Sequence, residues 1–309
     1  MADPLEHAHS GPAYEMLCDF QVGVIGAEEA IVNPDFEFTD GFKPEDTEVE
    51  GDYEKNKFLD LNRPLIMQVW NSNFSKGFYL QQVHQPRHLP GSAQLFGPWY
   101  LEMFTRTPWY MVPIFWMPIA IYLFYSSVQQ QPGVELATAV GRSGACFLLG
   151  NFIWTILEYG MHRFLFHIDD HLPDHYAALT LHFLLHGIHH YIPMDRLRLV
   201  MPPTLFGALQ YPFTQLAYAV FPRFVANGVI SGAFFFYVGY DSVHYALHHT
   251  KLPSYIRQIV RRLLTPFYCH HYKEPNMGFG VTSPFWDKVF GTEFVSLPKA
   301  AASPSAKAQ

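Results

Sequence analysis

Histidine in this chain is concentrated in two stretches, and long apolar segments lie before and between them. The first stretch runs from His162 to His190, and the second runs from His244 to His271. Because imidazole is the commonest neutral metal ligand in proteins, such a concentration predicts a site for more than one metal ion. The fold must therefore bring distant polar ligands together while it keeps the apolar segments away from water.

The apolar segments have the length and composition of membrane-spanning helices. They are Trp109–Val128, Leu136–Leu157, Pro203–Phe221 and Gly228–Val243. The first carries no charge and is long enough to cross about 30 Å of hydrocarbon. We interpret all four as transmembrane helices, although the last two could instead be buried core helices. The connections Gln129–Glu135 and Pro222–Asn227 are short, which predicts two helical hairpins.

The order of these segments places both histidine stretches on one side of the membrane. Two crossings separate the stretches, and an even number of crossings returns the chain to its starting side. Lysine and arginine are concentrated on that side, whereas the hairpin connections carry little positive charge beyond Arg223. The positive-inside rule then makes the histidine side cytosolic. The sequence thus predicts an all-α integral membrane protein, with four transmembrane helices in two hairpins and a cytosolic helical cap that holds the histidines.

Composition narrows the class of protein and divides the chain. Charged residues make up 15% of the sequence, and the net charge of −7 gives no reason to expect nucleic-acid binding. Three scattered cysteines predict no disulfide framework and fit a reducing compartment. Acidic residues crowd the region 28–54, so we expect a solvated linker over residues 21–69. A folded membrane domain should follow over residues 70–296, and a disordered tail over residues 297–309.

The spacing of the histidines suits metal ligands carried on helices. Residues three or four apart share a helix face, so His186, His189 and His190 could all point one way. His162 and His167 are five apart and need a helix end or a slightly turned face. The candidate ligands are His162, His167, His186, His189, His190, His244, His248, His270 and His271. This set exceeds the four ligands of tetrahedral zinc and suits two metal ions.

Other side chains near the clusters receive secondary roles. His182 is either a ligand or a partner of a ligand, and His249 is a weaker candidate than His248. Carboxylates often orient metal-bound imidazoles, and Asp169, Asp170 and Asp195 are candidates for that role. We expect surface or structural roles for His7, His84, His88, His171 and His175, membrane-interface positions for Trp99, Tyr100, Trp109 and Tyr110, and core packing rather than gating for Tyr191 and Tyr272.

The histidine motifs resemble those of a known superfamily. The patterns His162-x4-His167, His186-x2-His189-His190 and His244-x3-His248-His249 are similar to the histidine boxes of the fatty acid hydroxylases. Three longer runs, 162–173, 190–203 and 278–292, resemble one branch of it, the fatty acid 2-hydroxylases of sphingolipid synthesis. The resemblance covers roughly residues 70 to 295.

This resemblance implies a multi-pass enzyme of the endoplasmic reticulum membrane. It would hydroxylate carbon 2 of a long or very long acyl chain, either free or within ceramide, and would consume O2. Its electrons would come from cytochrome b5 and the NADH-dependent reductase of that protein. All-imidazole ligation suits iron, copper or zinc. The family is usually treated as di-iron, which fits oxygen activation, and its site can also hold zinc.

The chain departs from the family pattern in two places. The family's last box is His-x2-His-His, whereas this chain has Phe267 where the leading histidine belongs, with Cys269 beside His270 as a possible substitute. Residues 1–20 resemble the end of a cytochrome b5 domain, in which His9 matches one haem ligand. The His-Pro-Gly-Gly stretch with the other ligand does not occur here, so we expect no haem and a separate cytochrome b5 as donor.

Three other functions compete with this interpretation. A sterol or sphingoid-base oxidase belongs to the same superfamily, but the long run from Asp195 to Pro203 favours the 2-hydroxylase branch. A catalytically inactive relative would be consistent with Phe267. A membrane metal transporter would need ionisable groups within its spans, and the first apolar segment has none.

Overall fold

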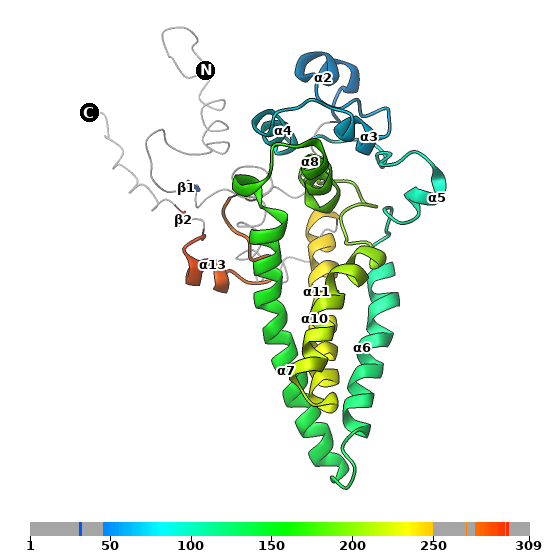
Figure 1. Cartoon of the computed structure of the whole chain (residues 1–309), viewed down its shortest axis with the longest axis vertical. Coiled ribbons are helices and arrows are strands. Elements are labelled where there is room, and N and C mark those ends of the chain that lie inside the picture. Colours follow the sequence, from blue (N-terminus) through cyan, green and yellow to red (C-terminus); the bar gives the residue numbers. More distant parts are fainter. Residues whose placement is uncertain (1–30, 33–45, 250–269, 271–275, 294, 297–309) are drawn as a thin grey trace, which may run out of the picture.

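The computed structural model of this chain describes residues 31–32, 46–249, 270, 276–293 and 295–296. Helices dominate these residues, and one short parallel pairing joins β1 (Ile31–Val32) to β2 (Val295–Ser296). Figure 1 shows a column of long helices with a cap of shorter helices at one end. The segment predicted to resemble cytochrome b5 (1–20) and the predicted tail (297–309) lie outside the described residues.

Four long helices form the column. They are α6 (Met111–Gln129), α7 (Leu136–Met161), α10 (Pro203–Val220) and α11 (Arg223–His249). The turn between α6 and α7 lies at the end of the column farthest from the cap (Figure 1). Proline begins α10 at Pro203, where its missing N–H costs no helical hydrogen bond. The expected apolar segments are therefore helices, with bounds close to those predicted for the first three.

The fourth long helix is much longer than its apolar segment. We expected a connection over Pro222–Asn227 and a helix over Gly228–Val243, but α11 runs unbroken from Arg223 to His249. Asn227 fits inside the helix because its side chain bonds to neighbouring helices: its amide donates to Ser126 Oγ at 3.1 Å and accepts from the Tyr218 hydroxyl at 2.7 Å. One rigid helix thus carries His244 and His248 up to the cap.

The helices follow one another along the chain as the two predicted hairpins, but they do not pack mainly within those pairs. α11 packs extensively along both α6 and α7, and α6 and α7 contact each other much less. Glycines permit this close approach: a Cβ added at Gly150 of α7 would overlap the backbone of Val229, and one added at Gly232 of α11 would overlap that of Phe147. Small residues commonly let membrane helices approach closely. The column is therefore built around α11.

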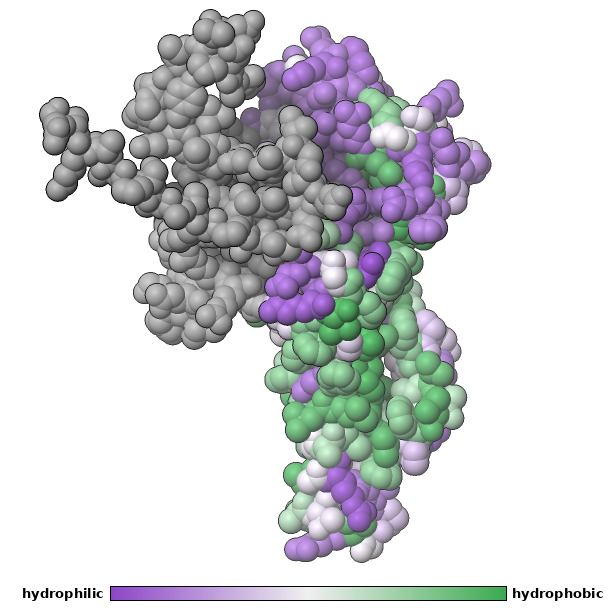
Figure 2. Space-filling view, turned by 90° about the vertical axis from the view of Figure 1, so that its left-hand side faces the viewer, coloured by the Kyte–Doolittle hydropathy of each residue, from purple (hydrophilic) through white to green (hydrophobic). Residues whose placement is uncertain are grey.

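The surface of the column is apolar. Figure 2 shows hydrophobic residues over its middle and more hydrophilic residues at its tip and on the cap. Among the described residues, two stretches, Met111–Gln129 and Leu136–His171, are long and apolar enough to cross a membrane. Large side chains such as Ile121, Tyr122, Leu148 and Phe152 are exposed on these helices, as they would be toward lipid. This pattern is that of a membrane protein.

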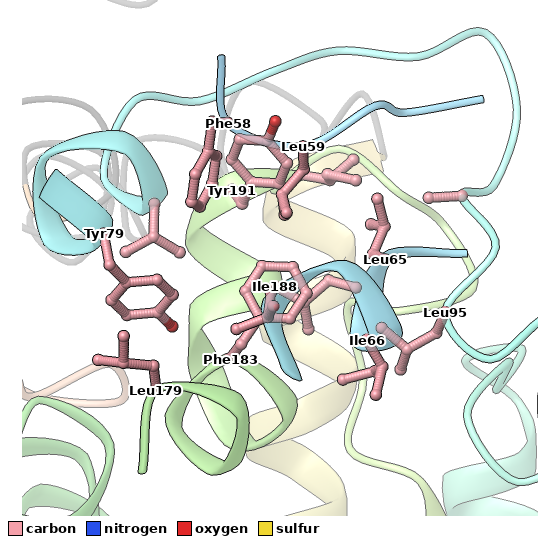
Figure 3. Close-up of a cluster of buried hydrophobic side chains, with 14 of the residues drawn as sticks. Phe58, Leu59, Leu65, Ile66, Tyr79, Leu95, Leu179, Phe183, Ile188 and Tyr191 are labelled. Atoms are coloured by element: carbon pink, nitrogen blue, oxygen red, sulfur yellow. The ribbon is translucent and has the colours of Figure 1, made fainter. Parts of the chain in front are cut away.

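The cap has its own hydrophobic core. Its helices are α2 (Val49–Asn56), α3 (Leu65–Trp70), α4 (Lys76–Val83), α5 (Trp99–Glu102), α8 (Tyr176–His182) and α9 (Ile188–Tyr191). Phe58, Tyr79, Leu179, Phe183 and Tyr191 meet in this core (Figure 3). Tyr191 is fully buried and packs edge-on against Phe58, with ring centroids 5.4 Å apart, which agrees with its expected role in packing. Apolar burial of this kind is the main stabilising term in such a core.

Residues 46–69 belong to the cap rather than to a solvated linker. The linker was expected over residues 21–69, yet Phe58, Leu59, Leu65 and Ile66 are buried in the cap core. The acidic residues nearby obscured these apolar positions. Some acids also have structural roles, because the Glu48 carboxylate caps α2 by accepting from Gly51 N at 2.6 Å. The linker therefore does not extend through residue 69.

The glycine contacts predict a position-dependent effect on stability. Replacing Gly232 by alanine should force α11 away from α7 and destabilise the protein by about 1–3 kcal/mol, as overpacking usually does. The matched control is Gly239→Ala on the same helix, since a Cβ there meets nothing within 4 Å. Thermal unfolding in detergent should show a lower midpoint for Gly232→Ala alone. Equal midpoints for the two variants would contradict this account of the packing.

Candidate metal centre

Five histidines from three separate segments converge beneath the cap. They are His162, His167, His186, His190 and His270, and their ligand atoms all lie within 4.8 Å of one another. Four are buried, and the fifth, His186, is half-buried. The group joins the end of α7, the segment around α9, and the C-terminal part of the chain.

A π-helical turn brings the first two of these histidines together. The turn spans His162–Phe166 directly after α7, and the His167 N–H donates to the His162 carbonyl at 3.0 Å. A π turn closes hydrogen bonds between residues five apart, and such turns often occur at functional sites. It therefore places two residues five apart on one face, and the two imidazole centroids lie 5.0 Å apart. The π turn thus explains how two histidines five residues apart can face the same centre.

The ring nitrogens crowd together more closely than hydrogen bonds alone explain. His167 Nε2 lies 3.1 Å from Nε2 of both His186 and His190, and 2.9 Å from Nε2 of His270. A neutral imidazole nitrogen carries either one hydrogen or one lone pair, so it cannot satisfy three such partners. A metal ion bonds to imidazole nitrogen at about 2.0–2.1 Å, and two ligands at right angles are then about 2.9 Å apart. The observed spacing therefore fits a shared ion with more than four ligands.

Backbone carbonyls orient two of these imidazoles toward the shared centre. His162 Nδ1 lies 2.7 Å from the Phe279 carbonyl, and His270 Nδ1 lies 2.9 Å from the Met277 carbonyl. A carbonyl can only accept, so each Nδ1 carries the hydrogen and each Nε2 keeps its lone pair. Metal-bound histidines are usually fixed in this way. The residues 277–279 thus act as outer partners of the site, which the sequence pattern did not indicate.

A second histidine group lies beside the first. It consists of His189, His244 and His248, all buried, and their ring centroids are separated by 5.1–6.0 Å. His186 and His189 link the groups, with centroids 5.5 Å apart. We expected that His186, His189 and His190 could all point one way, but His189 turns to the second group. Adjacent helical residues differ by about 100° in direction, so His189 and His190 face different centres.

Burial keeps these imidazoles in the form that binds metal. It lowers the pKa of His186 and of His270 well below the usual 6.5, and that of His189 to about 3. Neighbouring imidazoles lower all three further because adjacent positive charges repel. Near neutral pH the rings are therefore uncharged, and a neutral nitrogen with a lone pair is what a metal ion requires.

A network of close polar contacts lies behind the first group and centres on Asp169. Its carboxylate lies 3.1 Å from His182 Nε2, 3.5 Å from His84 Nε2 and 3.9 Å from His167 Nδ1. The other nitrogen of His182 bonds to the Tyr79 hydroxyl at 2.8 Å. Both nitrogens of His182 are thus engaged, and it is placed as a partner of ligands rather than as a ligand. Asp169 has the position expected of a carboxylate that orients imidazoles.

Three further residues, His84, Asp170 and Asp195, do not have the positions or roles expected of them. His84, expected at the surface or in a structural role, lies against the first group, with its ring centroid 5.3 Å from that of His190. No histidine motif surrounds it, so its place could not be inferred from the sequence pattern. Asp170 is exposed, and Asp195 accepts hydrogen bonds from Ser92 and Ala93 instead of orienting an imidazole. Neither therefore has the role expected of it.

Several other expected positions agree with the structure or fall outside it. His171 and His175 are exposed, and His249 packs on Tyr245 outside both groups. Trp99, Tyr100, Trp109 and Tyr110 are all exposed, and their place at a membrane interface stays a prediction. Outside the described residues lie His7, His9, Phe267, Cys269, His271 and Tyr272.

Two buried carboxylates hold the C-terminal part of the chain: Glu158 fastens it to α7, and Asp287 braces it from within. Glu158 accepts from the backbone N–H groups of Val281 and Thr282 at 3.1 and 3.0 Å. Asp287 accepts from the N–H groups of Phe279 and Gly280, both at 2.9 Å. These contacts place the carbonyls of residues 277–279 where His162 and His270 need them.

Two cavities adjoin the histidines. The first, which we call the α10 cavity, has a volume of about 360 Å³, lies between α7, α10 and α11, and reaches His162. The second, which we call the cap cavity, has a volume of about 420 Å³ and reaches His186, His189 and His244. Phe166, Met201 and Tyr240 line both. The two cavities therefore adjoin each other beside the histidine groups.

Comparisons with known proteins agree with this geometry. A family model described as fatty acid hydroxylase matches residues 147–292. A ceramide very long chain fatty acid hydroxylase of Saccharomyces cerevisiae is 44% identical, over 94% of this chain and 80% of its own length. A dihydroceramide fatty acyl 2-hydroxylase of Arabidopsis thaliana is 38% identical, over 76% of this chain and 92% of its own length.

More distant relatives and a solved structure extend the likeness. A fatty acid 2-hydroxylase of Homo sapiens is 32% identical, over 93% of this chain and 79% of its own length. A structure of full-length Scs7p, in which only the hydroxylase domain is visible, superposes with a TM-score of 0.74. That chain is 47% identical, and the match covers 82% of this chain and 93% of the other.

The two histidine groups predict separable metal losses. Purified protein should contain about two metal ions per chain, and His186→Ala and His248→Ala should each lose at least one, because each removes a nitrogen from a different group. The control is His175→Ala, which alters an exposed histidine. Elemental analysis by mass spectrometry measures the metal content. Wild-type metal content in both His186→Ala and His248→Ala would refute this assignment.

Asp169 and Asp170 offer a matched pair for the outer network. Asp169→Asn should weaken metal retention about 10- to 100-fold, as loss of an outer hydrogen-bond partner commonly does. Asp170→Asn should leave it unchanged, since that side chain is exposed. Competition with a chelator gives the affinities. Equal retention by the two variants would show that Asp169 does not position the ligands.

Proposed function

The chain belongs to the fatty acid hydroxylase family, and we propose that it hydroxylates carbon 2 of the acyl chain of ceramide-type sphingolipids. The observation that carries this proposal is the convergence of five imidazoles beside a second histidine group, at the point where the two cavities meet. The names of the relatives support the substrate class and the position of hydroxylation. The free fatty acid is the alternative substrate.

The histidines fit a pair of metal ions. His162, His167, His186, His190 and His270 would hold one ion, and His189, His244 and His248 would hold the other. His271 is a further proposed ligand, which lies outside the described residues. We propose iron as the active metal because the reaction consumes O2, and zinc as an ion that the same ligands can also bind. When bound, the metal pair would activate O2, which is the oxidant, and ordinary acid and base side chains cannot do this. Cytochrome b5 and its NADH-dependent reductase would supply the electrons.

Apolar side chains of the protein shape the site and exclude water from it. The Phe166 ring stacks on His186 with centroids 5.1 Å apart and an interplanar angle of 17°, so it covers that imidazole on one side. Phe166 and Met201 also line both cavities, where they would contact an acyl chain. Apolar walls favour an acyl chain over water. These residues therefore hold the substrate against the histidines and exclude solvent from the reacting carbon.

The proposed place of the protein is the endoplasmic reticulum membrane, with the cap in the cytosol. α6, α7, α10 and α11 would cross the bilayer as four helices. The apolar column of Figure 2 and the excess of Lys and Arg at the cap end support this orientation. A cytosolic cap would also expose the site to cytochrome b5. The alternatives within the superfamily are a sterol or sphingoid-base oxidase and an inactive relative.

Lipid mass spectrometry tests this function directly. The chain is expressed with a separate cytochrome b5 in cells that lack 2-hydroxylated sphingolipids. We expect 2-hydroxyacyl ceramides to appear, and we expect His186→Ala to abolish them because it removes one of the converging nitrogens. The control is His175→Ala, which should retain full activity.

Other outcomes of this experiment identify the alternatives. A hydroxylated sterol or sphingoid base in place of the ceramide product would indicate the other branch of the superfamily. No product from a well-expressed, metal-loaded protein would indicate the inactive relative. Phe267→His would then show whether the missing histidine is responsible.

A further inference from the structure

The α10 cavity is shaped like a slot for a long apolar chain. It begins at Met161 and His162 beside the first histidine group and extends to Val220 and Phe221, where α10 turns into α11. Along the way its polar groups are few, and two of them, Gln210 and Thr214, hydrogen-bond to each other. The cavity therefore offers an apolar path that starts at the metal ligands and runs to the turn between α10 and α11.

One face of α10 forms the wall of this slot. Leu209, Phe213 and Ala217 line it at intervals of four residues, which places them on one helix face, and Phe221 continues the series at the helix end. From Leu209 to Phe221 the helix rises about 18 Å. Phe206 is buried, whereas every other residue of α10, all of which the structure describes, is at least partly exposed. α10 thus stands apart from α7 and leaves the slot between them.

The cap cavity differs in character. Its lining includes Arg198, Asp241 and Thr204 as well as apolar side chains, and Asp241 accepts from the Met201 N–H at 3.2 Å. It can therefore receive a polar amide and the second chain of a ceramide better than the α10 cavity can. Carbon 2 is the first carbon beyond the amide carbonyl. It would lie where the two cavities meet, at Phe166, Met201 and Tyr240.

We propose that the α10 cavity measures the length of the acyl chain. This inference rests on the function proposed above. With carbon 2 held at the histidines, the rest of the acyl chain enters the slot, and the turn at Phe221 sets how much of it can be buried. Methylenes within the slot gain from contact with apolar walls, whereas methylenes beyond its end do not. Ala217 is the small residue that keeps the far part of the slot open.

Two neighbouring alanines provide the test. Ala217 lines the slot, whereas Ala219 is exposed on the same helix and does not line it. A phenylalanine at position 217 should block the far part, and the same change at position 219 should not. Phe221→Ala should act in the opposite direction because it removes the side chain at the far end.

The experiment is a competition between two substrates. Full-length protein, cytochrome b5, its reductase and NADH are supplied with equal amounts of palmitoyl ceramide and hexacosanoyl ceramide. We expect Ala217→Phe to lower the ratio of long to short hydroxylated product about tenfold, within the range that a few methylenes confer in an apolar pocket. Ala219→Phe should stay within about twofold of wild type, and Phe221→Ala should raise the ratio. A ratio that is unchanged in Ala217→Phe would overturn the proposal.

A binding measurement separates this proposal from the function on which it rests. Native mass spectrometry of the same proteins, incubated with the same mixture, reports which ceramide is bound without any turnover. If wild-type protein binds both ceramides but forms no product, the proposed function fails, and the bound ratio in Ala217→Phe still decides the role of the slot. A variant that turns over neither substrate is judged by the same ratio. An unchanged bound ratio would refute the length-measuring role.

Discussion

The Nε2 atoms of four imidazoles lie 2.9–3.1 Å from their neighbours and cannot satisfy each other, and the rest of the structure depends on this arrangement. Each ring comes from a segment that is anchored elsewhere: α7 in the column, the turn around α9 in the cap, and residue 270 near the C-terminal part. A metal ion at their centre would be coordinated by these nitrogens and would hold the segments together. Metal binding and assembly of the cap onto the column should therefore be coupled, as they are wherever ligands come from distant parts of a chain.

The C-terminal part of the chain supports this arrangement from outside. The Phe279 and Met277 carbonyls fix the orientation of His162 and His270, and Glu158 and Asp287 hold the loop that carries those carbonyls. A carboxylate in the apolar column would ordinarily be costly. Here Glu158 accepts three hydrogen bonds from Val281 and Thr282, which offset that cost. In the motif at residues 278–292 that resembles the family, main-chain groups therefore contribute to the site as much as side chains do.

Sequence patterns predicted the long helices and the gathering of histidines well, because both depend on local composition. The apolar segments appear as α6, α7 and α10 with nearly the expected bounds, and the residues of both histidine stretches meet. The division of His189 from His190 was not foreseen, because it depends on where each helix face points once the cap has folded. Nor was the proximity of His84, since it is an isolated histidine brought in by tertiary packing of α4. The acidic character of residues 46–69 hid apolar side chains whose burial only the folded cap reveals.

The unbroken length of α11 has a mechanical consequence. A helix of 27 residues is about 40 Å long, and this one runs from the turn at Arg223 to His248 in the second histidine group. Membrane helices answer a change in bilayer thickness by tilting. In the arrangement proposed above, in which α11 crosses the bilayer, its tilting would move His244 and His248 relative to His189, which is anchored in the cap. The lipid composition of the host membrane would then change the distances within the second histidine group. The product of this site is itself a membrane lipid.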